Sequence, residues 1–193
     1  TLLPILAALL LTACASASAS TATPAPTETP ASTAATLTLE QKVGQLFIVR
    51  PDALDLTLTQ ETIDDPRADG VTQVTDAMRE TLQQYPVGGI CQFGKNIESP
   101  SQLAHFNKDL QAASATPLFI TVDEEGGMVA RLANNDAFDL PRYASAATVG
   151  ASGDPENARA MGQTIGGYLK TYGFNMDFAP DADVNTNPDN PII

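Results

Sequence analysis

Short apolar runs alternate with segments of helical periodicity from Thr36 onward, and this alternation constrains the fold more than any other feature of the chain. Each run has the length of a strand, and each intervening segment has the length of a helix that could pack on it. This pattern is typical of βα units in a parallel sheet. The predicted strands are Leu46–Val49, Val87–Phe93, Pro117–Asp123 and Phe174–Pro180.

Local signals predict where the helices begin and end. Thr38 followed by Gln41 is a capping-box pattern, which predicts a short helix from Leu39 to about Gly44. The segment from Pro51 to Gly70 is polar and acidic and is predicted to be a loop. The other helices are predicted from apolar spacing between Val74 and Tyr85, from Ser99 before Pro100, and from Asp154 before Pro155 with a stop at Gly173.

Four strands joined by three helices correspond to half of a (β/α)8 barrel of the TIM type, or to most of a doubly wound sheet. Topology by itself does not choose between the two. A dinucleotide-binding doubly wound sheet would need a Gly-x-Gly-x-x-Gly turn after an early strand, and the sequence has none. No cofactor is expected.

The N-terminal 36 residues are predicted to be an export signal followed by a flexible linker. Leu2–Leu11 has the length of a signal-peptide core, and Leu11-Thr12-Ala13-Cys14 resembles the lipobox of bacterial lipoproteins, in which the cysteine carries the lipid. We therefore expect a partial signal peptide at 1–14, lipidation of Cys14 and a disordered Ser/Thr/Ala/Pro-rich linker at 15–36. The alternative is an ordinary secretory signal. Because the chain begins at Thr1 without Met or basic residues, we expect the leader to extend upstream.

The composition restricts the partners. A formal net charge of -13 with no basic cluster disfavours nucleic acid, whereas a neutral carbohydrate is compatible with it. The predicted membrane contact is the lipid anchor, which would hold the protein on the outer side of a membrane, outside the cytoplasm. The two cysteines, Cys14 and Cys91, lie in contexts too different for a disulfide, and Cys91 is predicted to be a core thiol.

Asp123 directly follows the apolar run Leu118–Val122 and ends the third predicted strand, at the edge where parallel α/β folds bind their ligands. Gly126-Gly127 permits a tight turn, so Arg131 could return to the same edge. A carboxylate that accepts hydroxyl protons and a guanidinium that donates in a fixed fork suit a polyhydroxylated ring. From the residues alone, the favoured interpretation of Asp123 is a strand-end carboxylate that caps the following turn.

The remaining polar residues receive structural predictions. Glu124 and Glu125 next to Asp123 do not predict a metal site, because adjacent acids point in different directions and no histidine is nearby. The single histidine, His105, has no predicted function. Asp181 and Asp183 are predicted to make local backbone bonds in a proline-rich turn, and the alternative is that they line the ligand-binding edge after the strand.

The run from Asp123 to Leu132 resembles the hallmark of glycoside hydrolase family 3, in its β-N-acetylhexosaminidase branch. Three further segments agree in order and spacing, so the resemblance covers about Thr38 to the end, and residues 37–193 are interpreted as the N-terminal part of the family's barrel domain. Met128 stands where the family usually has Arg. The matching segments are Leu39–Phe47, Val87–Phe93 and Asp177–Pro191.

The resemblance implies that Asp123 and Arg131 bind substrate hydroxyl groups, while the acid/base and the nucleophile lie downstream of Ile193. The fragment alone would then be inactive, because retaining glycosidases need both groups. The implied function is a retaining exo-glycosidase that removes terminal β-linked N-acetylglucosamine from peptidoglycan or chitin-type oligosaccharides. The alternatives are a β-glucosidase of the same family and a non-catalytic sugar-binding surface lipoprotein.

Overall fold

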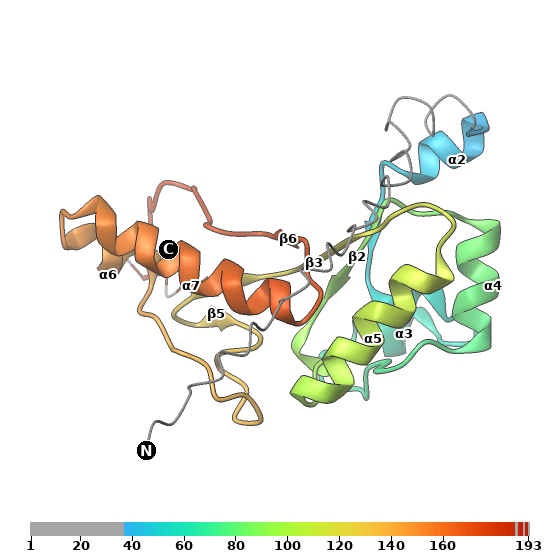
Figure 1. Cartoon of the computed structure of the whole chain (residues 1–193), viewed down its shortest axis with the longest axis horizontal. Coiled ribbons are helices and arrows are strands. Elements are labelled where there is room, and N and C mark those ends of the chain that lie inside the picture. Colours follow the sequence, from blue (N-terminus) through green and yellow to red (C-terminus); the bar gives the residue numbers. More distant parts are fainter. Residues whose placement is uncertain (1–36, 188, 191, 193) are drawn as a thin grey trace, which may run out of the picture. The chain divides into compact units, whose positions relative to one another are not determined.

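The computed structural model describes residues 37–187, 189, 190 and 192, and shows an α/β fold with a four-stranded parallel sheet (Figure 1). The strands follow one another across the sheet in the order in which they occur in the chain, and each pair is parallel. The predicted signal peptide, the linker and Cys14 lie outside the described residues. The strands are β1 (Ile48–Val49), β2 (Gly89–Gln92), β3 (Phe119–Val122) and β6 (Met176–Asp177).

A helix follows each of the first three strands, as predicted, and further short helices lie in the connections. The 51–70 segment was predicted to be a loop, and this prediction is wrong because the segment contains η1 and α3. Helix α6 was also not predicted. The helices are α2 (Leu39–Gly44), η1 (Pro51–Leu54), α3 (Gln60–Asp64), α4 (Asp76–Gln84), η2 (Gly94–Asn96), α5 (Pro100–Ala113), α6 (Ala146–Ala151) and α7 (Pro155–Thr171).

The helix boundaries confirm the local signals. Thr38 and Gln41 form the reciprocal capping box of α2, with bonds of 2.9 and 3.2 Å. The Ser99 hydroxyl accepts from the Gln102 amide at the start of α5. Gly173 adopts a φ of 87° directly after Tyr172, the C-cap of α7, in the left-handed region where a glycine stop is expected. The predicted strands contain β1, β2, β3 and β6 but are too long, at the start only for β1 and at both ends for the other three.

The core lies on one face of the sheet, against α4, α5 and α7. Ile90, Ile120 and Val122 are fully buried and belong to one cluster with apolar side chains of these three helices. The helix side chains in this cluster are Met78, Leu82, Leu103, Phe106, Leu110, Met161, Ile165 and Leu169. No helix in the described part of the chain is both long and apolar enough to cross a membrane.

The opposite face of the sheet is less covered. Phe119 of β3 is 54% exposed, although its neighbours Ile120 and Thr121 are buried. Cys91 aligns with Thr121 in the sheet and is half-buried, so the prediction that it is a core thiol is wrong. The strand alternation explains the error: Ile90 and Gln92 point into the helix layer, and Cys91 between them points to the other face.

Candidate functional site

The carboxyl end of β3 leads directly into a small antiparallel hairpin, β4 (Glu124–Gly126) and β5 (Val129–Ala130). Gly126 and Gly127 make its turn with φ values of 86° and 59°, a conformation that favours glycine. The turn is held by a 2.9 Å hydrogen bond from the Gly127 amide to the Tyr143 carbonyl. The hairpin therefore returns the chain to the strand end from which it began.

This return brings together the two residues predicted to bind substrate. Arg131 donates from Nη2 to Asp123 Oδ2 at 2.9 Å, and their side chains are 30% and 24% exposed. The bond to Arg131 is the only side-chain hydrogen bond of Asp123 to another described residue, which leaves Oδ1 free to accept from a ligand. Arg131 Nε is buried without a partner among the described residues. Sequence spacing thus placed both groups at one edge, as expected.

Glu124 fixes the hairpin from inside the protein. Its carboxylate is fully buried and accepts from the Leu132 amide at 2.8 Å, the Ala133 amide at 2.9 Å and the Tyr168 hydroxyl at 2.8 Å. Burial and the bond to Glu124 raise the pKa of Tyr168 far above its ordinary value. Because Leu132 follows Arg131 directly, the Glu124 carboxylate holds the backbone that carries the guanidinium.

A second carboxylate lies at the end of the neighbouring strand β6. Asp177 Oδ1 accepts from the Glu124 amide at 3.0 Å. Burial raises the pKa of Asp177 to about 6; the Glu124 amide bond opposes this, and the charges of Glu124, Asp123 and Glu125 add to it. Asp177 is thus a weakly acidic carboxyl within an acidic cluster. Across the described residues, no group of three His, Cys, Asp or Glu side chains could hold a metal ion.

A cavity of about 420 Å³ opens at the carboxyl ends of β1 and β2 and includes Arg131. The charges of the site also affect Cys91. Burial raises the pKa of its thiol to about 11, the negative charge of Asp123 adds to this shift, and the positive charge of Arg131 opposes it. The combination of charged and aromatic groups is suited to a polar ring. The cavity is lined by Arg50, Ile63, Asp64, Pro66, Phe93, Gly94, Lys95 and Arg131.

Asp181 and Asp183 follow β6 and make local backbone bonds. The Asp181 carboxylate accepts from the Asp183 amide at 2.8 Å, while the Asp181 amide donates to Glu125 Oε2 at 2.8 Å. Both aspartates also line a smaller cavity of about 250 Å³ beside the hairpin. Met128, the departure from the family pattern, is 66% exposed at the hairpin turn and lines the same cavity.

Comparison with known proteins decides the family. The model of the glycosyl hydrolase family 3 N-terminal domain matches residues 38–193. The chain belongs to glycosyl hydrolase family 3. This family assignment confirms the resemblance of the Asp123–Leu132 run.

Individual relatives within family 3 agree. Beta-hexosaminidase A of Pseudoalteromonas piscicida is 36% identical over 129 residues, which are 64% of this chain and 21% of that protein. The solved family 3 beta-N-acetylglucosaminidase of Paenibacillus sp. str. FPU-7 is 35% identical, with a TM-score of 0.64 over 80% of this chain and 26% of that one. NagZ of Neisseria gonorrhoeae, solved with N-trifluoroacetyl-D-glucosamine, is 25% identical, with a TM-score of 0.50 over 57% of this chain and 33% of that one. The chain thus spans a fifth to a third of the length of these relatives.

Sequence reasoning about this family 3 chain predicted that Asp123 and Arg131 would meet at one edge of the sheet, but it did not predict which residues hold them there. Glu124 was treated only as a rejected metal ligand, and its complete burial was not foreseen. Lys95 and Arg50 were not singled out, although each follows a predicted strand directly or within two residues. That position is the signal that could have identified them, because the ends of parallel strands meet at one edge.

Proposed function

We propose that the full-length protein is a retaining exo-glycosidase that removes terminal β-linked N-acetylglucosamine from peptidoglycan or chitin-type oligosaccharides. Membership of family 3 and the names of the relatives, beta-hexosaminidase and beta-N-acetylglucosaminidase, support this reaction and this sugar. The acid/base and the nucleophile would lie in the part of the protein that follows Ile193.

The observation that carries the proposal is the Asp123–Arg131 pair at the carboxyl end of β3. The 2.9 Å bond fixes both side chains before a ligand arrives, and each keeps part of its surface exposed. A free carboxylate oxygen can accept from one sugar hydroxyl while the guanidinium donates to another. Groups that are already oriented lose little entropy on binding, which favours a defined position of the ring.

We further propose that the sheet is the first half of a (β/α)8 barrel. The strands keep their chain order across the sheet, and the core helices lie on one face, whereas a doubly wound sheet reverses its order and carries helices on both faces. The exposed ring of Phe119 lies on the opposite face, where a barrel packs its interior side chains.

The location is also a proposal. The lipobox-like run that ends at Cys14 would attach the protein to a membrane by a lipid, and the segment 15–36 would let the domain reach its substrate. An enzyme on the outer side of the membrane would meet cell-wall or chitin-derived oligomers directly.

The function is tested with the full-length protein and two chromogenic substrates, an aryl β-N-acetylglucosaminide and an aryl β-glucoside. We expect preferential hydrolysis of the first. Asp123→Ala should lower kcat/KM by about 100-fold or more, because a charged contact to the substrate is lost in the transition state. Asp136→Ala is the matched control, since Asp136 also pairs with an arginine, Arg142 at 2.6 Å, but is 95% exposed.

The outcomes separate the three functions. Preference for the glucoside would establish the β-glucosidase alternative. Sugar binding without hydrolysis of either substrate would favour the non-catalytic lipoprotein. If a folded Asp123→Ala variant had the kinetics of the wild type, the binding role of Asp123 would be refuted even though the enzyme itself remained a hexosaminidase.

A further inference from the structure

A buried ion pair lies behind the cavity at the ends of β1 and β2. Asp52 is fully buried, and its carboxylate accepts from the Val71 amide at 3.1 Å and from Asn96 Nδ2 at 2.9 Å. Lys95 Nζ lies 3.5 Å from Asp52 Oδ1, and only 10% of its side chain is exposed. The pair therefore joins the segment after β1 to the segment after β2.

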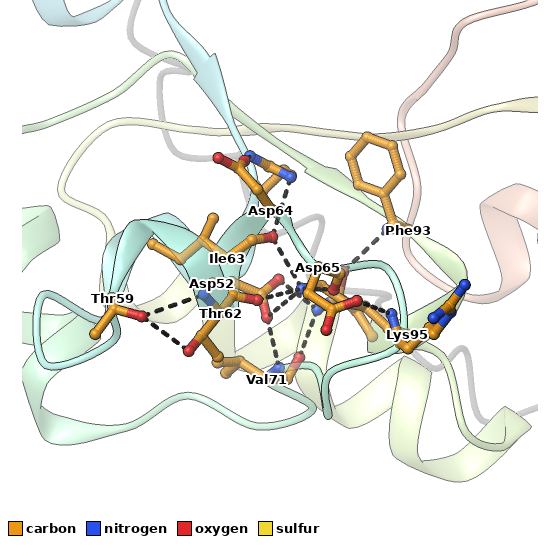
Figure 2. Close-up of polar contacts among 12 residues, drawn as sticks. Asp52, Thr59, Thr62, Ile63, Asp64, Asp65, Val71, Phe93 and Lys95 are labelled. Atoms are coloured by element: carbon orange, nitrogen blue, oxygen red, sulfur yellow. Dashed lines mark hydrogen bonds and ion pairs between the residues drawn. The ribbon is translucent and has the colours of Figure 1, made fainter.

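The Lys95 ammonium also holds the end of α3 (Figure 2). Nζ donates to the Ile63 carbonyl at 3.0 Å and lies 3.4 Å from the carbonyls of Thr62 and Asp65. These carbonyls belong to the last turn of α3 and to its C-cap residue, where a positive charge is favourable. Because the three N–H donors of the ammonium already face four protein oxygens, Lys95 has no donor to spare for a substrate.

Arg50 provides a second attachment for the same helix end. It donates from Nη1 to the Ile63 carbonyl at 3.1 Å and forms an ion pair with Asp64. Helix α3 has only five residues, which is too short to be stable by itself. Thr59 caps its start and Ile63 is buried, while the two cations that follow β1 and β2 hold its end.

The end of α3 is one wall of the cavity that contains Arg131. Ile63, Asp64 and Pro66 line this wall, and Phe93 and Gly94 line the side formed by the segment after β2. Figure 2 shows the ring of Phe93 directed away from the Lys95–Asp52 contacts. A displacement of α3 would thus change the shape of the space next to the Asp123–Arg131 pair.

We propose that Lys95 is a positioning residue for substrate: with Asp52 as its counter-ion, it holds the end of α3 as a fixed wall of the sugar site. This inference rests on the proposed function. Buried ion pairs contribute little net stability compared with apolar replacements, so the geometry that this pair fixes is a better account of its presence. A fixed wall lowers the entropy that the protein loses when the terminal sugar binds.

The test uses the full-length protein and the aryl β-N-acetylglucosaminide. The double variant D52N/K95M removes both buried charges together, so neither is left unpaired. We expect its KM to rise about fivefold or more while kcat changes by less than about twofold, because the wall affects binding rather than the chemical step. Trypsin cleavage after the exposed Arg67 should accelerate about tenfold, since this bond lies just beyond α3.

Two further variants isolate the cause. K95R keeps a cation with donors for the same carbonyls, so its KM should stay within about twofold of the wild type. The control E156Q/R159M removes an exposed ion pair on α7, in which Arg159 Nε lies 3.2 Å from Glu156 Oε2, and should change neither KM nor cleavage after Arg67.

The proposal fails if D52N/K95M keeps the wild-type KM while cleavage after Arg67 accelerates. It also fails if the KM of K95R differs from that of the wild type by more than about twofold. If the double variant does not fold, Asp64→Ala loosens the wall from its exposed side, and a KM equal to that of the wild type would overturn the proposal. Lack of hydrolysis by the wild-type protein would instead reject the proposed function. The trypsin comparison would still show whether Lys95 holds α3.

Discussion

Replacement of the buried Glu124 by Gln tests how the hairpin that carries Arg131 is held. The carboxylate serves three donors, the amides of Leu132 and Ala133 and the Tyr168 hydroxyl. A glutamine side chain has a single acceptor oxygen, so its NH₂ group must face at least one of the two buried amides. That amide loses its acceptor, and the remaining bonds lose the negative charge.

The expected cost follows from these losses. A buried donor without a partner costs about 1–3 kcal/mol, and bonds to a neutral acceptor are weaker by about 1 kcal/mol each than bonds to a charged one. We therefore expect Glu124→Gln to lower the free energy of unfolding of this domain by about 3–5 kcal/mol at pH 7. KM for the aryl β-N-acetylglucosaminide should rise as well, because the two amides held by Glu124 belong to the residues that directly follow Arg131.

Urea unfolding of the full-length protein, followed by circular dichroism, measures this effect. The matched control is Glu125→Gln, since Glu125 accepts from the exposed Asp181 amide at 2.8 Å and is less buried than Glu124. The control should cost less than about 1 kcal/mol. Equal destabilisation by the two substitutions would refute the account of Glu124 as the buried anchor of the hairpin.

Four further predictions concern single positions. Tyr168→Phe should cost about 1.5–3 kcal/mol in urea unfolding, because Glu124 loses one donor; an unchanged midpoint would contradict this. The folded protein holds the Asp177 proton more tightly than the unfolded chain, so this group's stabilising effect is complete below pH 3.8 and is lost as the pH rises through about 6. Asp177→Asn should therefore weaken the dependence of the thermal unfolding midpoint on pH between pH 3.8 and about 6. A pH dependence identical to that of the wild type would argue against the raised pKa. Gly126→Ala should cost about 1–3 kcal/mol, since φ is 86° and a Cβ would lie 2.7 Å from a side-chain atom of Met161; calorimetry measures the cost, and a neutral effect would exclude this turn geometry. Cys14→Ser should release the full-length protein from the membrane fraction, and persistence there would indicate another anchor.

Local chemistry was sufficient to predict the order of elements and several boundaries. The capping box at Thr38, the Ser99-Pro100 start and the Gly173 stop each depend on atoms a few residues apart, so they form in any fold that contains the helix. The pairing of Asp123 with Arg131 could also be predicted from the sequence, because the two glycines between them allow a tight turn that brings the chain back to the strand end. The lipobox and linker predictions stay predictions.

Tertiary structure decided what supports the pair. Lys95 reaches carbonyls 30 to 33 positions earlier in the chain, and Glu124 receives a hydroxyl 44 positions later. Helix α3 was missed for a related reason: its five residues lack an apolar period, and the side chains that hold its end come from Arg50 and Lys95. The sequence by itself determined the order of the four strands and of the longer helices, and it placed Asp123 and Arg131 at one edge of the sheet. Burial and long-range pairing of charges, which depend on the packing of the whole domain, determined how those residues are held.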